Sequence, residues 1–188
     1  MAGGSLALSA GEGSAVVQGR ITMDPIKQTY HINASPEEVW RALTDPAMIE
    51  RWSEADAEFE PAVGAEYALW DGNIGGEIVA VEPHKKLVQT WQPENWERDD
   101  SVVTFTLTPV GTKTRVDLLH ENVEEFDYAG TRVGWHAYYL GAIKRMFDTK
   151  SAKQVRSAKP PKKPKVSKGK SAANAKRSAT KKATRKRR

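Results

Sequence analysis

The 188-residue chain contains no cysteine, and this absence excludes several classes of protein at once. Without cysteine there is no disulfide framework, no thiol nucleophile and no cysteine-ligated zinc or iron–sulfur site. No apolar run approaches the ~20 residues that a membrane-spanning helix needs. The N-terminus also lacks the basic segment and continuous apolar core of a secretory signal. We therefore expect a cytoplasmic protein of a reducing compartment, without a membrane span.

Catalytic and metal-binding motifs are missing as well. The sequence has no GxSxG nucleophile turn, no phosphate-binding loop and no HExxH pair. Its four histidines have no partner at metal-ligand spacing. They are His31, His84, His120 and His136. We therefore predict no metal, no cofactor and no catalytic residue.

Two charged features still need an interpretation. His120 with Glu121 resembles an acid–base pair at the edge of a sheet, but we favour a strand-end histidine that lies partly in solvent. The acidic group at Glu124, Glu125 and Asp127 is interpreted as solvated loop charge.

The two signs of charge are distributed very unequally along the chain. Residues 151–188 contain 16 Lys or Arg and no Asp or Glu, whereas the first 150 contain 13 basic and 24 acidic residues. The net charge of +5 therefore combines an acidic body, formally −11, with a basic tail, formally +16. We predict three parts: a disordered segment over residues 1–24, a folded domain over 25–150 and a disordered tail over 151–188. Met23 precedes the first patterned segment and is a second candidate for the natural start.

The folded part begins with a strand followed by two short helices. Ile26–Ile32 alternates in polarity as a strand does. Ser35 as N-cap, Pro36 at the first helical position and Glu38 three residues after the cap predict a helix start. Asp45-Pro46 ends that helix before another turn or two over 47–52.

Six more strands and one long helix follow. Asp71-Gly72-Asn73 supplies residues that tolerate positive φ, as a hairpin turn requires. Asp127–Lys150 has a helical apolar stripe, on which Gly134 and Gly141 share one face. The predicted strands are 57–59, 67–70, 74–81, 87–91, 103–107 and 114–120. This order predicts an α+β helix-grip fold, a curved antiparallel sheet wrapped around the long C-terminal helix.

Three stretches resemble the family of activators of the heat-shock protein 90 ATPase, in its C-terminal-type domain: SPEEVWRALTDPAMIERW, YALWDGNIGGEIVAVEPHKKLVQTW and GWHAYYLGAIKRMF. The resemblance covers about residues 26–148 and places the chain in the START/SRPBCC (Bet v-like) superfamily. It implies a helix-grip fold and a heat-shock chaperone as a partner. It also implies a binding site between helix and sheet, since superfamily members bind lipids, hormones or polyketides there. These implications give two hypotheses, a non-enzymatic binding protein and a stimulator of a chaperone ATPase. Cyclase and hydrolase members of the superfamily supply a third, an enzyme that acts on a hydrophobic substrate.

Aromatic residues are the candidate walls of such a site. Aromatic walls with few polar groups suit an apolar small molecule, although the same residues could simply fill the core. Gly134 and Gly141 favour a cavity, because they remove side chains from the helix face. Trp96 lies in a polar loop and is predicted to make an exposed contact. The cavity candidates are Trp40, Tyr67, Trp91, Phe105, Trp135 and Tyr139.

The basic tail is the other candidate site. Dense cationic chains gain affinity for nucleic acid by releasing counterions, and the absence of aromatic residues here argues against base stacking. Such binding would associate the protein with the nucleoid, and the same basic residues would act as a nuclear import signal where the source has a nucleus. The alternatives are a solubilising tail or one that folds back on the acidic body. The tail candidates are Lys162, Lys163, Lys165, Lys181, Lys182, Arg185, Lys186, Arg187 and Arg188.

Overall fold

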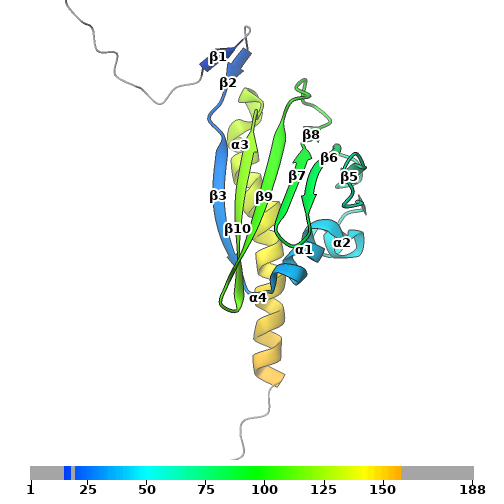
Figure 1. The fold of residues 1–188 in the computed structure, drawn as a ribbon, viewed down its shortest axis with the longest axis vertical. Helices are drawn as coiled ribbons and strands as arrows, with labels where there is room; N and C mark the ends of the chain where they lie inside the picture. The colour runs from blue at the N-terminus through cyan, green and yellow to red at the C-terminus, as the bar shows by residue number, and fades with distance from the viewer. Residues whose placement is uncertain (1–14, 18–19, 158–188) are drawn as a thin grey trace, which may run out of the picture. The chain divides into compact units, whose positions relative to one another are not determined.

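The computed structural model describes residues 15–17 and 20–157, with side chains described from residue 23 to residue 150 (Figure 1). Residues 158–188, which include all nine tail candidates, lie outside this range. Within the segment predicted to be disordered, β1 (Ala15–Val17) and β2 (Arg20–Thr22) pair as an antiparallel hairpin. The last helix runs to Ser157, seven residues beyond the predicted domain end at residue 150.

The domain consists of one antiparallel sheet, two short helices and a long helix that is divided into four consecutive segments. The sheet has eight strands in the order β3-β10-β9-β7-β6-β5-β4, with β8 paired to β6. Its strands are β3 (Ile26–Ile32), β4 (Ala57–Glu58), β5 (Glu66–Leu69), β6 (Ile74–Glu82), β7 (Lys86–Thr90), β8 (Gln92–Pro93), β9 (Val102–Val110) and β10 (Lys113–Glu121). The short helices α1 (Pro36–Thr44) and α2 (Pro46–Ser53) lie between β3 and β4. The prediction of a helix-grip fold is confirmed (Figure 1).

The start of α1 follows the predicted chemistry closely. The Ser35 hydroxyl accepts a hydrogen bond from the Glu38 backbone N–H, and the Glu38 carboxylate accepts one from the Ser35 N–H, each at 3.3 Å. This reciprocal pair satisfies two donors that a helix N-terminus leaves without partners. The predicted capping box and the break at Asp45 are both confirmed.

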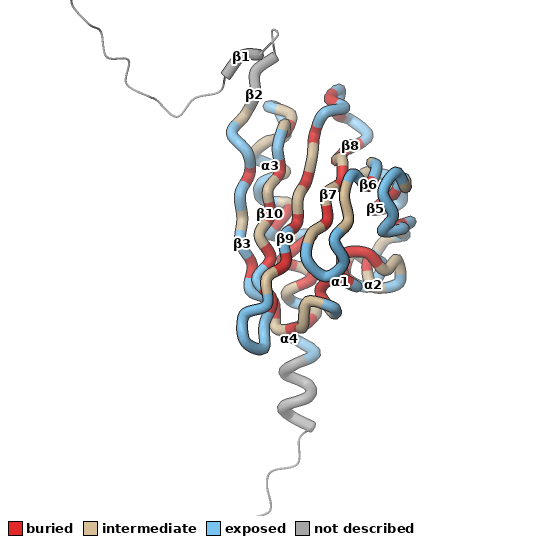
Figure 2. Tube along the Cα trace, viewed as in Figure 1, coloured by how far each residue is buried: buried red, intermediate tan, exposed pale blue. Residues whose placement is uncertain are grey.

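Alternation along β9 and β10 creates the face that the helix covers. Val103, Phe105 and Leu107 are buried, whereas the threonines between them are half-buried or exposed. Figure 2 shows buried positions alternating with less buried ones along β9. Val116 and Leu118 repeat the pattern on β10, directly opposite Leu107 and Phe105. These inward positions are confirmed.

The long helix differs from the uniform α-helix that the apolar stripe predicts. It is divided into a 3₁₀ turn η1 (Glu125–Asp127), helix α3 (Tyr128–Gly134), a π-helical turn η2 (Trp135–Tyr139) and helix α4 (Leu140–Ser157). Gly141 makes the π turn possible, because a Cβ at this position would lie 1.8 Å from the carbonyl oxygen of His136. Gly141 therefore accommodates the helix's own backbone and opens no space toward the sheet. Such π turns are rare and often occur at functional sites.

Candidate ligand pocket

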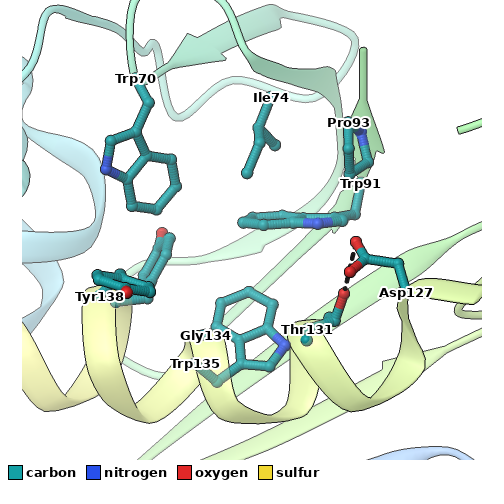
Figure 3. Close-up of a pocket in the computed structure, with 11 residues that line it drawn as sticks. Trp70, Ile74, Trp91, Pro93, Asp127, Thr131, Gly134, Trp135 and Tyr138 are labelled. Carbon is teal, nitrogen blue, oxygen red and sulfur yellow. Dashed lines mark hydrogen bonds between the residues drawn. The ribbon is translucent and has the colours of Figure 1, made fainter. Parts of the chain in front are cut away.

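A pocket of about 550 Å³ lies between the sheet and the N-terminal half of the long helix (Figure 3). Its walls come from the β5–β6 turn, the β7–β8 region and the helical segments from η1 to η2. The lining residues are Trp70, Ile74, Trp91, Pro93, Asp127, Gly130, Thr131, Gly134, Trp135, Tyr138 and Tyr139. Five of these eleven residues are aromatic, and Asp127 and Thr131 place a carboxylate and a hydroxyl at one end of the pocket (Figure 3).

The β5–β6 turn places Trp70 against the pocket through an unusual backbone conformation. Trp70, Asp71 and Gly72 all have positive φ, at 51°, 57° and 87°. A left-handed conformation is costly for a bulky residue and persists only where its surroundings hold it. The Trp70 carbonyl accepts a hydrogen bond from Asn73 Nδ2 at 2.6 Å, and the Asp71 carboxylate accepts one from the Asp56 N–H at 3.0 Å. The predicted turn is present, but its left-handed stretch begins one residue earlier than expected.

Gly134 leaves the helix side of the pocket open. A Cβ built at this position meets no atom within 4 Å, so the missing side chain corresponds to empty space. Tyr138, one turn later, is 69% exposed and stands at the rim. The expectation that Gly134 makes room beside the helix agrees with this geometry, whereas the same expectation for Gly141 is wrong.

The six cavity candidates separate into two groups of three. Trp91, Trp135 and Tyr139 line the pocket, with ring centroids 4.6 Å apart for the two tryptophans and 4.9 Å apart for Trp135 and Tyr139. The other three belong to the core outside this pocket: Trp40, Tyr67 and Phe105.

Two residues of the second group, Phe105 and Tyr67, have structural neighbours that explain their place. Phe105 stacks on Tyr139 at 5.5 Å, on the side toward the sheet. Tyr67 donates a hydrogen bond to the Thr90 carbonyl at 2.5 Å, and Gly76 permits this path because a Cβ there would lie 2.8 Å from the Tyr67 ring. Both side chains therefore fill the core and do not line the pocket.

Sequence patterns missed several lining residues. Trp70, at the end of a predicted strand, is not among the six cavity candidates, and Asp127 is predicted to carry solvated loop charge at the start of the long helix. The signal for Trp70 was its position directly before the Asp71-Gly72-Asn73 turn. No local pattern indicated Pro93 or Thr131. Tyr138 lies within the π turn, whose departure from α-helical spacing the apolar stripe does not predict.

His120 is fully buried, so the prediction of a histidine partly in solvent is wrong. The Trp135 Nε1–H donates to His120 Nδ1 at 3.1 Å, and His120 Nε2 lies 2.9 Å from Ser101 Oγ. Trp96 covers the ring on another side, stacked at 6.0 Å. Burial lowers the pKa of His120 to about 3, since a charged imidazolium would lose its hydration there.

The Ser101–His120 pair has the spacing of a nucleophile and base but the wrong proton arrangement. An indole nitrogen can only donate, so His120 Nδ1 must accept and the ring proton resides on Nε2. Nε2 then donates to Ser101 Oγ and cannot take a proton from it, while the serine hydroxyl is directed to the Glu121 carbonyl at 3.4 Å. Both side chains are at most 1% exposed. The network therefore connects β10, the loop before β9 and the long helix.

Trp96 is also buried, at 5% exposure, so the predicted exposed contact is wrong. Its Nε1–H donates to Asp127 Oδ2 at 3.0 Å. The polar loop folds over the end of β10, and the tryptophan closes the side of the His120 network. The charged composition of this loop predicted exposure and gave no indication that Trp96 is buried.

Three polar atoms in the core lack a partner among the residues that the structure describes. They are Nε2 and Oε1 of Gln89 and the hydroxyl oxygen of Tyr139. Burial raises the pKa of both Tyr139 and Tyr67. The nearby Gln89 carboxamide acts to lower the pKa of Tyr67, although neither of its polar atoms completes a hydrogen bond. Unpaired polar atoms of this kind are uncommon in folded cores.

Two further observations concern residues 15–17 and 20–157. No group of three or more His, Asp or Glu side chains in this part of the chain is arranged to hold a metal ion. No helix in it has the length and apolar character required to cross a membrane.

The curated relatives match between 65% and 77% of this chain. The human activator of 90 kDa heat shock protein ATPase homolog 1 is 28% identical over 123 residues, covering 65% of this chain and 36% of the human protein. The chain spans between 34% and 44% of the length of the curated relatives that it matches.

Solved structures agree in fold. An HSP90 activator from Plasmodium falciparum superposes with a TM-score of 0.61 at 25% identity, covering 66% of this chain and 96% of that one. Protein MLL2253 from Mesorhizobium loti superposes with a TM-score of 0.57 at 34% identity, covering 67% and 98%. The family model described as Activator of Hsp90 ATPase homolog 1-like protein matches residues 33–148, from just before α1 to the packed part of α4. This chain therefore belongs to the family of Activator of Hsp90 ATPase homolog 1-like proteins.

Proposed function

We propose that this protein is a non-enzymatic binding protein whose helix-grip domain holds an apolar small molecule in the aromatic pocket. The observation that carries the proposal is the pocket itself, about 550 Å³ in volume and lined by five aromatic side chains. Small-molecule sites are usually apolar concavities of roughly 300–1,000 Å³ with a few polar groups that fix orientation. Gly134 supports it further, since glycine in a helix interior costs about 1 kcal/mol and here leaves space unfilled.

Filling the pocket tests this proposal. We would titrate the full chain with the neutral fluorophore N-phenyl-1-naphthylamine and record both its emission and that of tryptophan. Gly134→Leu places a side chain in the open space and should weaken binding at least tenfold without lowering the melting temperature. Ala129→Leu is the matched control, because Ala129 is exposed on the same helix and does not line this pocket. Equal binding by the Gly134 variant would exclude the pocket as the site.

A second candidate function is stimulation of a heat-shock protein 90 ATPase. Membership of the family favours it, as do the names of the human and Plasmodium relatives. The chain covers 36% of the human protein, so the activity of that whole protein is a proposal here. The test is ATP turnover by the heat-shock protein 90 of the same source, measured with rising amounts of the full chain. Unchanged turnover at saturation would exclude this function.

We also propose that the basic tail contacts nucleic acid or another polyanion, and so associates the protein with a nucleoid or nucleus. Its 16 positive charges without a negative one support this. Retardation of a random-sequence DNA duplex should decline steeply with salt, because each neutralised phosphate contributes about −0.9 to the log–log slope. A chain truncated after Ser157 should lose the retardation. Full retention by the truncated chain would assign the contact to the body.

A further inference from the structure

The aromatic pocket has one charged side chain among the described residues that line it. This residue is Asp127, at the junction of η1 and α3, and Figure 3 shows it beside Thr131 at one end of the pocket. Its Oδ2 accepts hydrogen bonds from Trp96 Nε1 at 3.0 Å and from Thr131 Oγ1 at 3.2 Å. Two donors on the same oxygen hold the carboxylate in one orientation.

The other carboxylate oxygen of Asp127 is left available. Among the residues that the structure describes, none donates a hydrogen bond to Oδ1. Gly130 keeps this oxygen uncovered, because a Cβ at that position would lie 2.6 Å from it. A fixed acceptor with a formal negative charge therefore stands next to an apolar space.

The aromatic wall favours the same sign of ligand charge. Ring faces carry negative potential and attract cations, and tryptophan does so most strongly. The indole N–H of Trp135 is engaged by His120, so this side chain presents carbon and π surface to the pocket. The rings of Trp91 and Trp135 lie 4.6 Å apart and form a continuous aromatic corner.

Ligands of other charge fit this arrangement less well. An anion would meet the Asp127 carboxylate without a compensating positive side chain in the wall. A purely apolar ligand would remove water from Oδ1 and leave that charged acceptor without a partner, which is unfavourable.

We propose that the pocket selects an organic cation, with an N–H of an ammonium group on Asp127 Oδ1 and an aromatic or aliphatic body against Trp91 and Trp135. This inference rests on the proposed function and narrows it, because it adds one cationic group to the otherwise apolar ligand of the same pocket. The recognition combines a charge-assisted hydrogen bond with cation–π attraction, and these reinforce each other in a partly dry site.

The test uses three probes of equal length that differ in charge: 4-phenylbutylammonium, 4-phenyl-1-butanol and 4-phenylbutyrate. Binding to the full chain is measured by tryptophan fluorescence and by calorimetry at pH 7 and low salt. The cation should bind about tenfold more tightly than the alcohol, and the anion most weakly. The alcohol is the stringent competitor, since it too can donate a hydrogen bond to Oδ1.

Two variants locate the selectivity. Asp127→Asn keeps an acceptor for Trp96 and Thr131 but replaces the free oxygen by an N–H donor, so the preference for the cation should be lost while the alcohol still binds. Glu125→Gln removes an equal charge from an exposed position outside the pocket and should retain the preference. Thermal melting of both variants checks that they are folded. Alcohol or anion binding equal to that of the cation would overturn the inference and leave the pocket intact, whereas absence of binding by all three probes would overturn the proposed function as well.

Discussion

The two halves of the long helix differ in how they meet the sheet. Leu140, Ile143 and Phe147 of α4 are at most 2% exposed, so this half is locked into the core. Helix α3 contains no buried residue, and hollows lie on both of its sides, the larger being the aromatic pocket. The π turn η2 joins the halves. The comparison teaches that one continuous helix can anchor a fold with one end and form a pocket wall with the other.

Truncating a side chain in the packed half should have the largest effect. Ile143→Ala removes three buried carbons and should lower the free energy of unfolding by about 2–5 kcal/mol, through lost burial and the cavity left behind. Val133→Ala on α3, where the side chain is 65% exposed, is the matched change and should stay within about 0.5 kcal/mol. Urea denaturation measures both. Equal losses would show that the two halves are packed alike.

Low pH should have the next largest effect, because it acts on His120, which accepts a hydrogen bond from Trp135 of the π turn η2. The pKa of this histidine is about 3 in the folded protein and near 6.5 unfolded, so below pH 6.5 the unfolded state binds the extra proton. Stability is then fully present above pH 6.5 and should decrease by about 2 kcal/mol between pH 7 and pH 5. The neighbours of the ring are Ser101, Trp91, Trp96 and Trp135.

Variants assign that pH dependence. His120→Gln can accept from Trp135 and donate to Ser101 but does not titrate, so its unfolding free energy should vary little over this range. His136→Gln changes an exposed histidine and should keep the slope. A slope that persists in the His120 variant would place its origin elsewhere.

Gly141→Ala should disrupt the π turn η2 that joins the two halves of the helix. The added Cβ would meet the His136 carbonyl, and backbone cannot yield as a flexible side chain does. We expect a loss of about 1–3 kcal/mol, a size typical of local backbone strain, although alanine is the better helix former. Tryptophan emission should also shift, because Trp135 and Tyr139 lie within the π turn. A stabilised variant with unchanged emission would contradict the role assigned to this glycine.

Gly134→Ala should give the smallest effect and the opposite sign. Its Cβ meets nothing within 4 Å and the residue is helical, so the variant should gain about 0.5–1 kcal/mol from helix propensity. Thermal unfolding measures the gain. Two glycines seven residues apart on one helix would thus respond oppositely, since one faces open space and the other faces backbone.

The elements of this fold could be predicted because their signals are local. Ser35, Pro36 and Glu38 satisfy backbone groups within one turn, and the alternation of Val103, Phe105 and Leu107 assigns their faces whatever the rest of the chain does. The site was predictable only in part. Trp91, Trp135 and Tyr139 were identified by residue type, but type does not distinguish a pocket wall from a packed core.

The amino-acid sequence by itself determined the order of α1, α2 and seven of the eight strands of the large sheet, the helix start at Ser35 and the separation of an acidic body from a basic tail. Tertiary structure alone decided that His120 and Trp96 are buried and that Asp127 reaches the aromatic pocket. The physical reason is the separation along the chain of the residues that interact. Capping and periodicity depend on neighbours along the chain, whereas burial depends on which distant segments fold over a residue, and here a polar loop and a π turn bring those segments together.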